Sequence, residues 1–178
     1  MVKTNPNFER FRAFTLIEVI VVMVIIAIMA VVALPTFSNI NSSRAGVAAR
    51  MIARDLTYAR ERAIATGTRT WVVFSAGTNS YSVLSENSAS PGRVGATTLT
   101  DPNGSGKSFV QYLNTGDYAG VTITGATFGS GSEVGFDWVG KPYNSSSTAL
   151  TAAGTVTLSA GSYTVTVQPT TGLAKVTP

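Results

Sequence analysis

Apolar and polar residues follow three successive patterns along this chain. Residues 14–34 are apolar apart from Thr15 and Glu18, and about 20 such residues span a bilayer core as a helix. Beyond Pro35, apolar residues recur at three- and four-residue steps, which is typical of an amphipathic helix. These positions are Phe37, Ile40, Val47 and Met51, with Arg44 interrupting, and then Ile52, Leu56, Ala59 and Ala63. From Arg69 onward the period is two, which indicates strands.

The alternating region, residues 69–178, is expected to form antiparallel β-structure. Segments 69–75 and 80–85 flank the turn-forming residues 76–79 and predict a hairpin, and Gly67 is expected to end the preceding helix. Residues 86–107 are expected to form a loop. Further strands are expected within 108–113, 121–128, 133–138, 155–158, 162–168 and 173–176. The predicted fold class is α+β, with an amphipathic helix over 39–66 packed on an antiparallel sheet.

The charges before the apolar run predict how the chain is oriented in a membrane. Lys3, Arg10 and Arg12 precede the run and only Glu9 opposes them, which predicts a cytoplasmic N-terminus and an exported C-terminal domain. The run is longer than the apolar region of a conventional cleaved signal peptide, and a helical pattern follows it. We therefore expect a single-pass membrane segment over residues 14–38.

Composition argues against most catalytic chemistry. The chain has no Cys and no His, and only 12% of its residues are charged. This excludes disulfides, thiolate nucleophiles and histidine acid–base catalysis. Asp117, Glu133 and Asp137 have no spacing that requires them to meet, and no phosphate-binding loop is present. We expect neither an enzyme nor a cofactor.

The start of the apolar run resembles the N-terminal signature of type IV pilins and pseudopilins. It reads Arg12-Ala-Phe-Thr-Leu-Ile-Glu18, followed by apolar residues. In that family a prepilin peptidase removes a short basic leader and methylates the new N-terminus. The resemblance implies that residues 1–13 are the leader, that cleavage falls between Ala13 and Phe14, and that Phe14 becomes N-methylated. The residue before the cleavage site is usually Gly in the family, whereas here it is Ala13.

Glu18 and Pro35 are the candidate assembly residues. A carboxylate within an apolar span costs on the order of 2.5–3.5 kcal/mol, so such a residue usually has a functional partner. The resemblance implies that this partner is the N-terminal amine of a neighbouring filament subunit; a tolerated interfacial Glu is the alternative. Pro35 removes one helical hydrogen bond and favours a kink, as in many pilins, or else marks a helix end.

A second resemblance, to the GspH/FimT group, covers most of the remaining chain. It rests on residues 51–70, on Phe136-Asp-Trp-Val-Gly-Lys-Pro142, and on the alternating segments 154–158, 164–167 and 172–176, while residues 86–130 diverge. This group comprises minor pilins of type IV pili and H-type pseudopilins of type II secretion. The resemblance implies a structural subunit that initiates or caps a filament. Its implied partners are other pilins or pseudopilins, the prepilin peptidase and the inner membrane, with a final location in a periplasmic or extracellular filament.

Arginines on the amphipathic helix are the remaining candidate binding residues. Arg50 and Arg54 are expected to point away from the apolar face, with Arg60 and Arg62 on its flanks. Neither Asp55 nor Glu61 lies three or four residues from any of them, so no intrahelical pairing is expected. Such arginines can contact neighbouring subunits, be solvated, or bind nucleic acid as in a FimT-like DNA-uptake protein.

Residues 101–106, Asp-Pro-Asn-Gly-Ser-Gly, match the first half of a calcium-binding loop. The closing Glu is missing, because Tyr112 stands in its place, and no helical pattern flanks the loop. A flexible turn explains the same residues, and no metal is expected.

Overall fold

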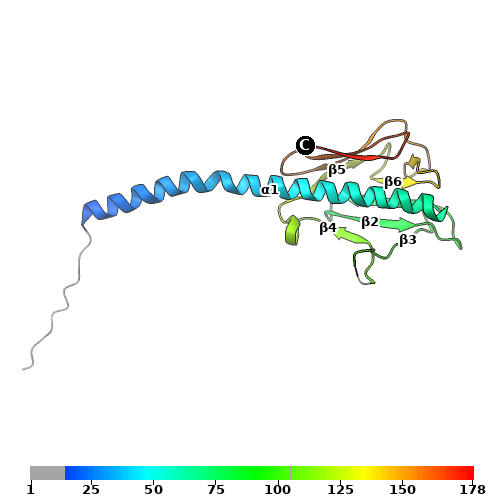
Figure 1. Ribbon diagram of the computed structural model, residues 1–178, viewed down its shortest axis with the longest axis horizontal. Helices are drawn as coiled ribbons and strands as arrows, with labels where there is room; N and C mark the ends of the chain where they lie inside the picture. The colour runs from blue at the N-terminus through cyan, green and yellow to red at the C-terminus, as the bar shows by residue number, and fades with distance from the viewer. Residues whose placement is uncertain (1–14, 105) are drawn as a thin grey trace, which may run out of the picture. The chain divides into compact units, whose positions relative to one another are not determined.

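The computed structural model describes residues 15–104 and 106–178; within the helix, the side chains of residues 32–39 lie outside the description. The chain divides into two compact units, Met1–Phe37 and Ser38–Pro178. One helix, α1 (Leu16–Thr66), contributes residues to both units and includes Pro35 within its bounds. Pro35 is therefore not a helix end. The remaining elements all belong to the second unit (Figure 1).

Helix α1 ends where the sequence predicts. Gly67 adopts φ +67°, and its N–H donates to the carbonyl of Ala63 at 3.0 Å. This left-handed residue closes the last turn without the steric cost that a side chain would bring. The chain then enters the strands.

The strands form two antiparallel sheets, whereas the sequence analysis expected one. A six-stranded sheet has the order β3-β2-β1-β6-β7, with β4 also paired to β2, and a four-stranded sheet has the order β10-β9-β8-β5. The strands are β1 (Thr70–Ser75), β2 (Ser80–Ser85), β3 (Thr97–Thr98), β4 (Val110–Tyr112), β5 (Ile123–Thr127), β6 (Glu133–Phe136), β7 (Pro142–Tyr143), β8 (Gly154–Leu158), β9 (Thr164–Val167) and β10 (Ala174–Thr177). A short 3₁₀ helix, η1 (Gly116–Tyr118), precedes β5.

The hairpin β1–β2 confirms the alternating pattern. Its six pairs run from Thr70 with Ser85 to Ser75 with Ser80. Asn79 in the turn has φ 47° and links the sheets, because its side-chain oxygen accepts a hydrogen bond from the backbone of Ile123 at 3.1 Å. Two short strands were missed: β3 lies inside the expected loop, and β7 begins at Pro142.

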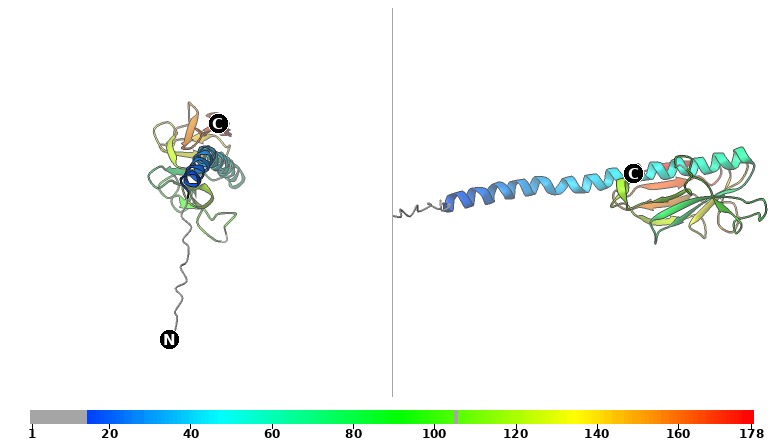
Figure 2. Two further views of the ribbon diagram at one scale, coloured as in Figure 1. Left: turned by 90° about the vertical axis from the view of Figure 1, so that its left-hand side faces the viewer. Right: turned by 90° about the horizontal axis from the view of Figure 1, so that it is seen from below.

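One core joins the second part of α1 to both sheets, and Figure 2 shows this part of the helix lying along one side of the strands. The helix contributes fully buried side chains at three- and four-residue spacing: Ala45, Ala48, Ala49, Ile52, Leu56, Ala59 and Ala63. Phe74 of β1 stacks on Phe128 at the end of β5, with ring centroids 5.7 Å apart. The sequence placed Ile40 and Val47 in this apolar face, and that prediction was wrong because both are exposed. Small alanines there allow the helix to approach the sheets closely.

Candidate functional site

The candidate cleavage residues Ala13 and Phe14 lie outside the described residues, so the site begins at Thr15. Its hydroxyl accepts a hydrogen bond from the backbone N–H of Glu18 at 3.3 Å. Thr15 therefore caps the N-terminus of α1. The carboxylate of Glu18 lies in the first turn, where its negative charge interacts favourably with the helix dipole. The sequence signal for this cap is a Thr followed three residues later by Glu.

The described residues of the first unit expose many large apolar side chains. Large apolar side chains between Leu16 and Val31 are exposed by 47% to 78%. Glu18 borders a shallow apolar hollow that Val19, Val22, Met23 and Ile26 also line. Among the described residues, no helix is both long and apolar enough to cross a membrane.

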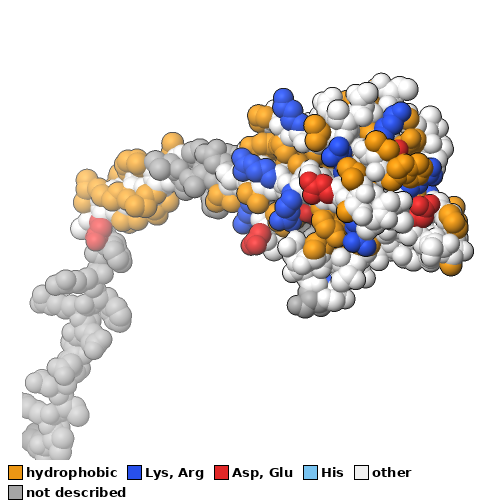
Figure 3. Space-filling model, turned by 45° about the vertical axis from the view of Figure 1, so that its right-hand side comes forward, with side chains coloured by type: hydrophobic (Ala, Val, Ile, Leu, Met, Phe, Trp, Pro, Cys, Tyr) orange, Lys and Arg blue, Asp and Glu red, His pale blue; other side chains and the backbone are white. Residues whose placement is uncertain are grey.

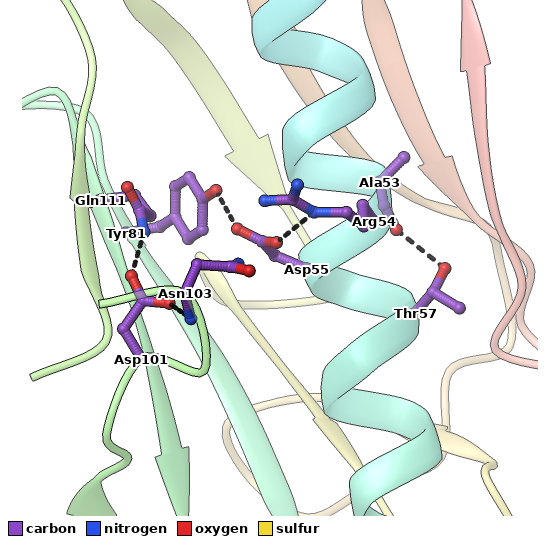
Figure 4. A network of polar contacts seen from close by, with 8 residues as sticks. All are labelled: Ala53, Arg54, Asp55, Thr57, Tyr81, Asp101, Asn103 and Gln111. Atoms are coloured by element: carbon purple, nitrogen blue, oxygen red, sulfur yellow. Dashed lines mark hydrogen bonds and ion pairs between the residues drawn. The ribbon is translucent and has the colours of Figure 1, made fainter. Parts of the chain in front are cut away.

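Arg54 is paired, which corrects the expectation that no arginine in this stretch has an acidic partner. Its Nε donates to Oδ1 of Asp55 at 3.1 Å, and the hydroxyl of Tyr81 donates to Oδ2 at 2.7 Å (Figure 4). Asp55 is only 2% exposed, and burial raises the pKa of its carboxyl although both hydrogen bonds act to lower it. The spacing rule failed because Asp55 points into the core, where the long side chain of its neighbour can reach it.

The other three arginines have different surroundings. Arg60 donates from Nε to the backbone carbonyls of Thr171 at 2.8 Å and Gly140 at 3.3 Å. Arg50 is exposed. The Nε of Arg62 is buried and has no hydrogen-bond partner within the described part of the chain. The four side chains therefore do not form one uniform exposed row.

The loop that resembles a calcium site is organised as a turn. Oδ1 of Asp101 accepts a hydrogen bond from the backbone of Asn103 at 2.8 Å, and Oδ2 accepts one from the side chain of Gln111 at 2.9 Å. Gln111 and Tyr112 belong to β4, which docks this loop on β2. Across the described residues, no three acidic side chains come together in a way that would hold a metal ion.

A further site, missed by sequence reasoning, is the turn 137–141. Asp137 is 6% exposed, and its Oδ1 accepts hydrogen bonds from the backbone N–H groups of Lys141 at 2.8 Å and Val139 at 3.0 Å. Oδ2 accepts one from the hydroxyl of Tyr143 at 3.2 Å. The turn holds Trp138 and Val139 outward, 55% and 68% exposed. The sequence analysis used residues 136–142 only as part of the GspH/FimT resemblance, and Asp followed three residues later by Gly is common in turns.

Comparisons with known proteins give two findings. Residues 10–34 match the family model described as "Prokaryotic N-terminal methylation motif". Two solved structures of the minor pseudopilin EpsH from the type II secretion system of Vibrio cholerae have the same fold, with TM-scores of 0.56 and identities of 14% and 13%. They cover 75% and 76% of this chain and 96% and 97% of their own. No curated protein matches in sequence. The chain thus combines a prepilin-type start with a minor-pseudopilin fold, as the sequence analysis predicted.

Proposed function

We propose that this chain is a minor pilin or pseudopilin, a structural subunit that helps to initiate or cap a pilus-like filament. The supporting observation is the presence, in one chain, of the methylation motif at residues 10–34 and the fold of a minor pseudopilin. A membrane-tethered enzyme or sensor would need an apolar anchor but no processing motif. The family's members are structural subunits that assemble with other pilins.

The proposal assigns three successive roles along the chain. Residues 1–13 are the leader that a prepilin peptidase removes, leaving N-methylated Phe14. Residues 14–38 anchor the subunit in the inner membrane, with the N-terminus in the cytoplasm. The same segment, which includes the assembly residue Pro35, later packs among neighbouring subunits. Residues 39–178 form the exported domain. Glu18 pairs with the N-terminal amine of a neighbour, in addition to its place in the capped first turn.

One specific candidate is an H-type pseudopilin of type II secretion. It is favoured because both matched structures are described as minor pseudopilins of that secretion system. A minor pilin of a type IV pilus is the other form of the same proposal. The two differ in their partner subunits, which the genes neighbouring this one would identify.

Processing tests the proposal directly. We expect that co-expression of the full chain with an active prepilin peptidase yields a mature protein that begins with N-methylated Phe14, because the motif supplies the recognition sequence. Mass spectrometry of the N-terminus measures this. A matched culture with an inactive peptidase should retain residues 1–13. An intact leader in the presence of the active peptidase would contradict the proposal.

A further inference from the structure

We propose that the folded unit carries a docking surface for a second protein whose contact face is apolar and ringed by acidic side chains. We call it the turn surface, and define it by Ile64, Trp138, Val139, Leu173 and Lys141. It lies where the end of α1, the turn 137–141 and the start of β10 meet. It goes beyond the filament role proposed above, in which the packing among subunits is assigned to the N-terminal helix.

Two turns and the helix are locked together at this place. Arg60 bonds to the carbonyls of Gly140 and Thr171, so one helix side chain holds both turns. Gly172, with φ +67°, packs so closely on Gly140 that any added Cβ would meet the carbonyl oxygen of Gly140. A Cβ on Gly140 would come within 2.8 Å of Ile64. These contacts place Ile64 and the residues next to both glycines side by side.

The locked elements present apolar side chains to solvent. Val139 is 68% exposed, Trp138 55%, Leu173 52% and Ile64 43%. A buried carboxylate, that of Asp137, holds the turn that bears two of them. An exposed apolar patch on a rigid support indicates an interaction site, and Trp is among the residues that contribute most to protein interfaces. A flexible loop would lose more entropy on binding than this braced turn.

The charges around the patch specify the partner. The guanidinium of Arg69 lies 5.9 Å from the ring centroid of Trp138, Lys141 is exposed, and Arg60 lies beneath. Glu61 is the exposed carboxylate one helical turn before Ile64. Figure 3 shows apolar, basic and acidic side chains interspersed on one face of residues 38–178. The basic rim favours a partner with Asp and Glu around an apolar centre.

The same charges argue against a second copy of this chain. Residues 38–178 contain ten Lys and Arg and seven Asp and Glu, which gives a net charge of +3. A symmetric dimer through the turn surface would bring two copies of the same patch together, so that Lys141 and Arg69 of both copies would share one interface with the single carboxylate of Glu61 from each. Like charges in such positions weaken association. We therefore assign the surface to a different protein.

Photo-crosslinking in the source cells tests the assignment on the full chain. Benzoylphenylalanine in place of Val139 should give a crosslinked product, whereas the same residue in place of Val94 should not. Val94 is a matched control because it is fully exposed and lies outside the turn surface. Mass spectrometry should locate the crosslink in a partner segment with apolar residues flanked by Asp or Glu. Equal yields from both positions, or no product from Val139, would overturn the proposal.

Charge reversal tests the basic rim. Lys141→Glu should reduce the crosslink yield by roughly tenfold or more, because it places like charges across the interface. Lys107→Glu, also at an exposed lysine, should leave the yield unchanged. Both variants should accumulate at the level of the wild type. A crosslink to a second copy of the chain or to nucleic acid would overturn the assignment to an acidic protein.

Leader removal is measured in the same cells, so that the two proposals fail separately. A processed chain without the Val139 crosslink contradicts the turn surface alone. An unprocessed chain contradicts the filament function, whatever the crosslink shows.

Discussion

Asp55 is buried and joins α1 to β2 through a hydrogen bond from Tyr81. The sequence analysis considered this residue only as a partner for the helix arginines and made no prediction of its burial. Burial also raises the pKa of the Tyr81 phenol well above its usual range, so this hydroxyl remains a donor at ordinary pH. The polar contact is therefore a fixed part of the core, and Asp55 is its only member that titrates in acid.

The raised pKa of Asp55 predicts a specific pH dependence. Its carboxyl has a folded pKa above the ordinary 3.8, so its contribution to stability is complete below that value and is lost as pH rises through the folded pKa. Asp55→Asn cannot titrate. The stability of the wild type relative to this variant should therefore fall as the pH rises from about 3.8 through the higher folded pKa of Asp55. Thermal unfolding followed by circular dichroism measures both proteins, and a difference that is constant with pH would contradict the expectation.

Helix α1 is the element that determines how the second unit packs. Leu56 is fully buried, and Leu56→Ala should lower the free energy of unfolding by about 2–5 kcal/mol because a cavity remains. Val47, which the sequence pattern placed on the same face, is 51% exposed, and Val47→Ala should change stability by less than about 0.5 kcal/mol. Denaturant unfolding compares the two. Equal losses would show that the core lies along a different helix face.

Local sequence patterns predicted where each helix and strand lies better than they predicted which strands pair with one another. The hairpin β1–β2 and the helix end at Gly67 follow from alternation and from one glycine, because both are short-range features. The division into two sheets depends on long-range pairing, such as β1 with β6, which alternation does not encode. Val47 was misplaced because an alanine-rich helix face buries small residues that a hydrophobicity pattern ranks low.

The same contrast applies to the candidate sites. A motif of consecutive residues identified the start of the chain, and the family model matches it at residues 10–34. The bonds of Arg60 to Gly140 and Thr171 join residues 80 and 111 positions apart, and nothing near Arg60 in the sequence signals them. The exposure of Trp138 likewise depends on a turn that Asp137 holds from within. Sites that depend on contacts between residues far apart in the sequence therefore could not be predicted from residue spacing.

At the scale of the whole molecule, Glu18 is expected to matter for assembly rather than for folding. Glu18→Ala removes a charge from an apolar helix face and leaves the second unit untouched, so the subunit should accumulate normally. It should lose efficient incorporation into filaments, because the N-terminal amine of a neighbour loses its partner. Immunoblots of sheared filaments against total cell protein measure this ratio. Thr15→Ala is the control for a simple capping effect, and incorporation of Glu18→Ala at the wild-type level would exclude a pairing role.

Nucleic-acid binding by the arginines of α1 is the remaining alternative, and the structure makes a weak salt dependence the expected result. Arg54 and Arg60 already have partners within the chain, which leaves about two of the four predicted phosphate contacts. Two contacts give a slope of about −1.8 in log K against log salt, or a loss of roughly tenfold between 50 and 200 mM salt. Fluorescence anisotropy with duplex DNA measures the slope. Arg50→Ala should reduce it by about 0.9, whereas Lys175→Ala, on β10, should not. Micromolar or tighter binding at physiological salt that Arg50→Ala abolishes would make DNA capture the leading function of this chain.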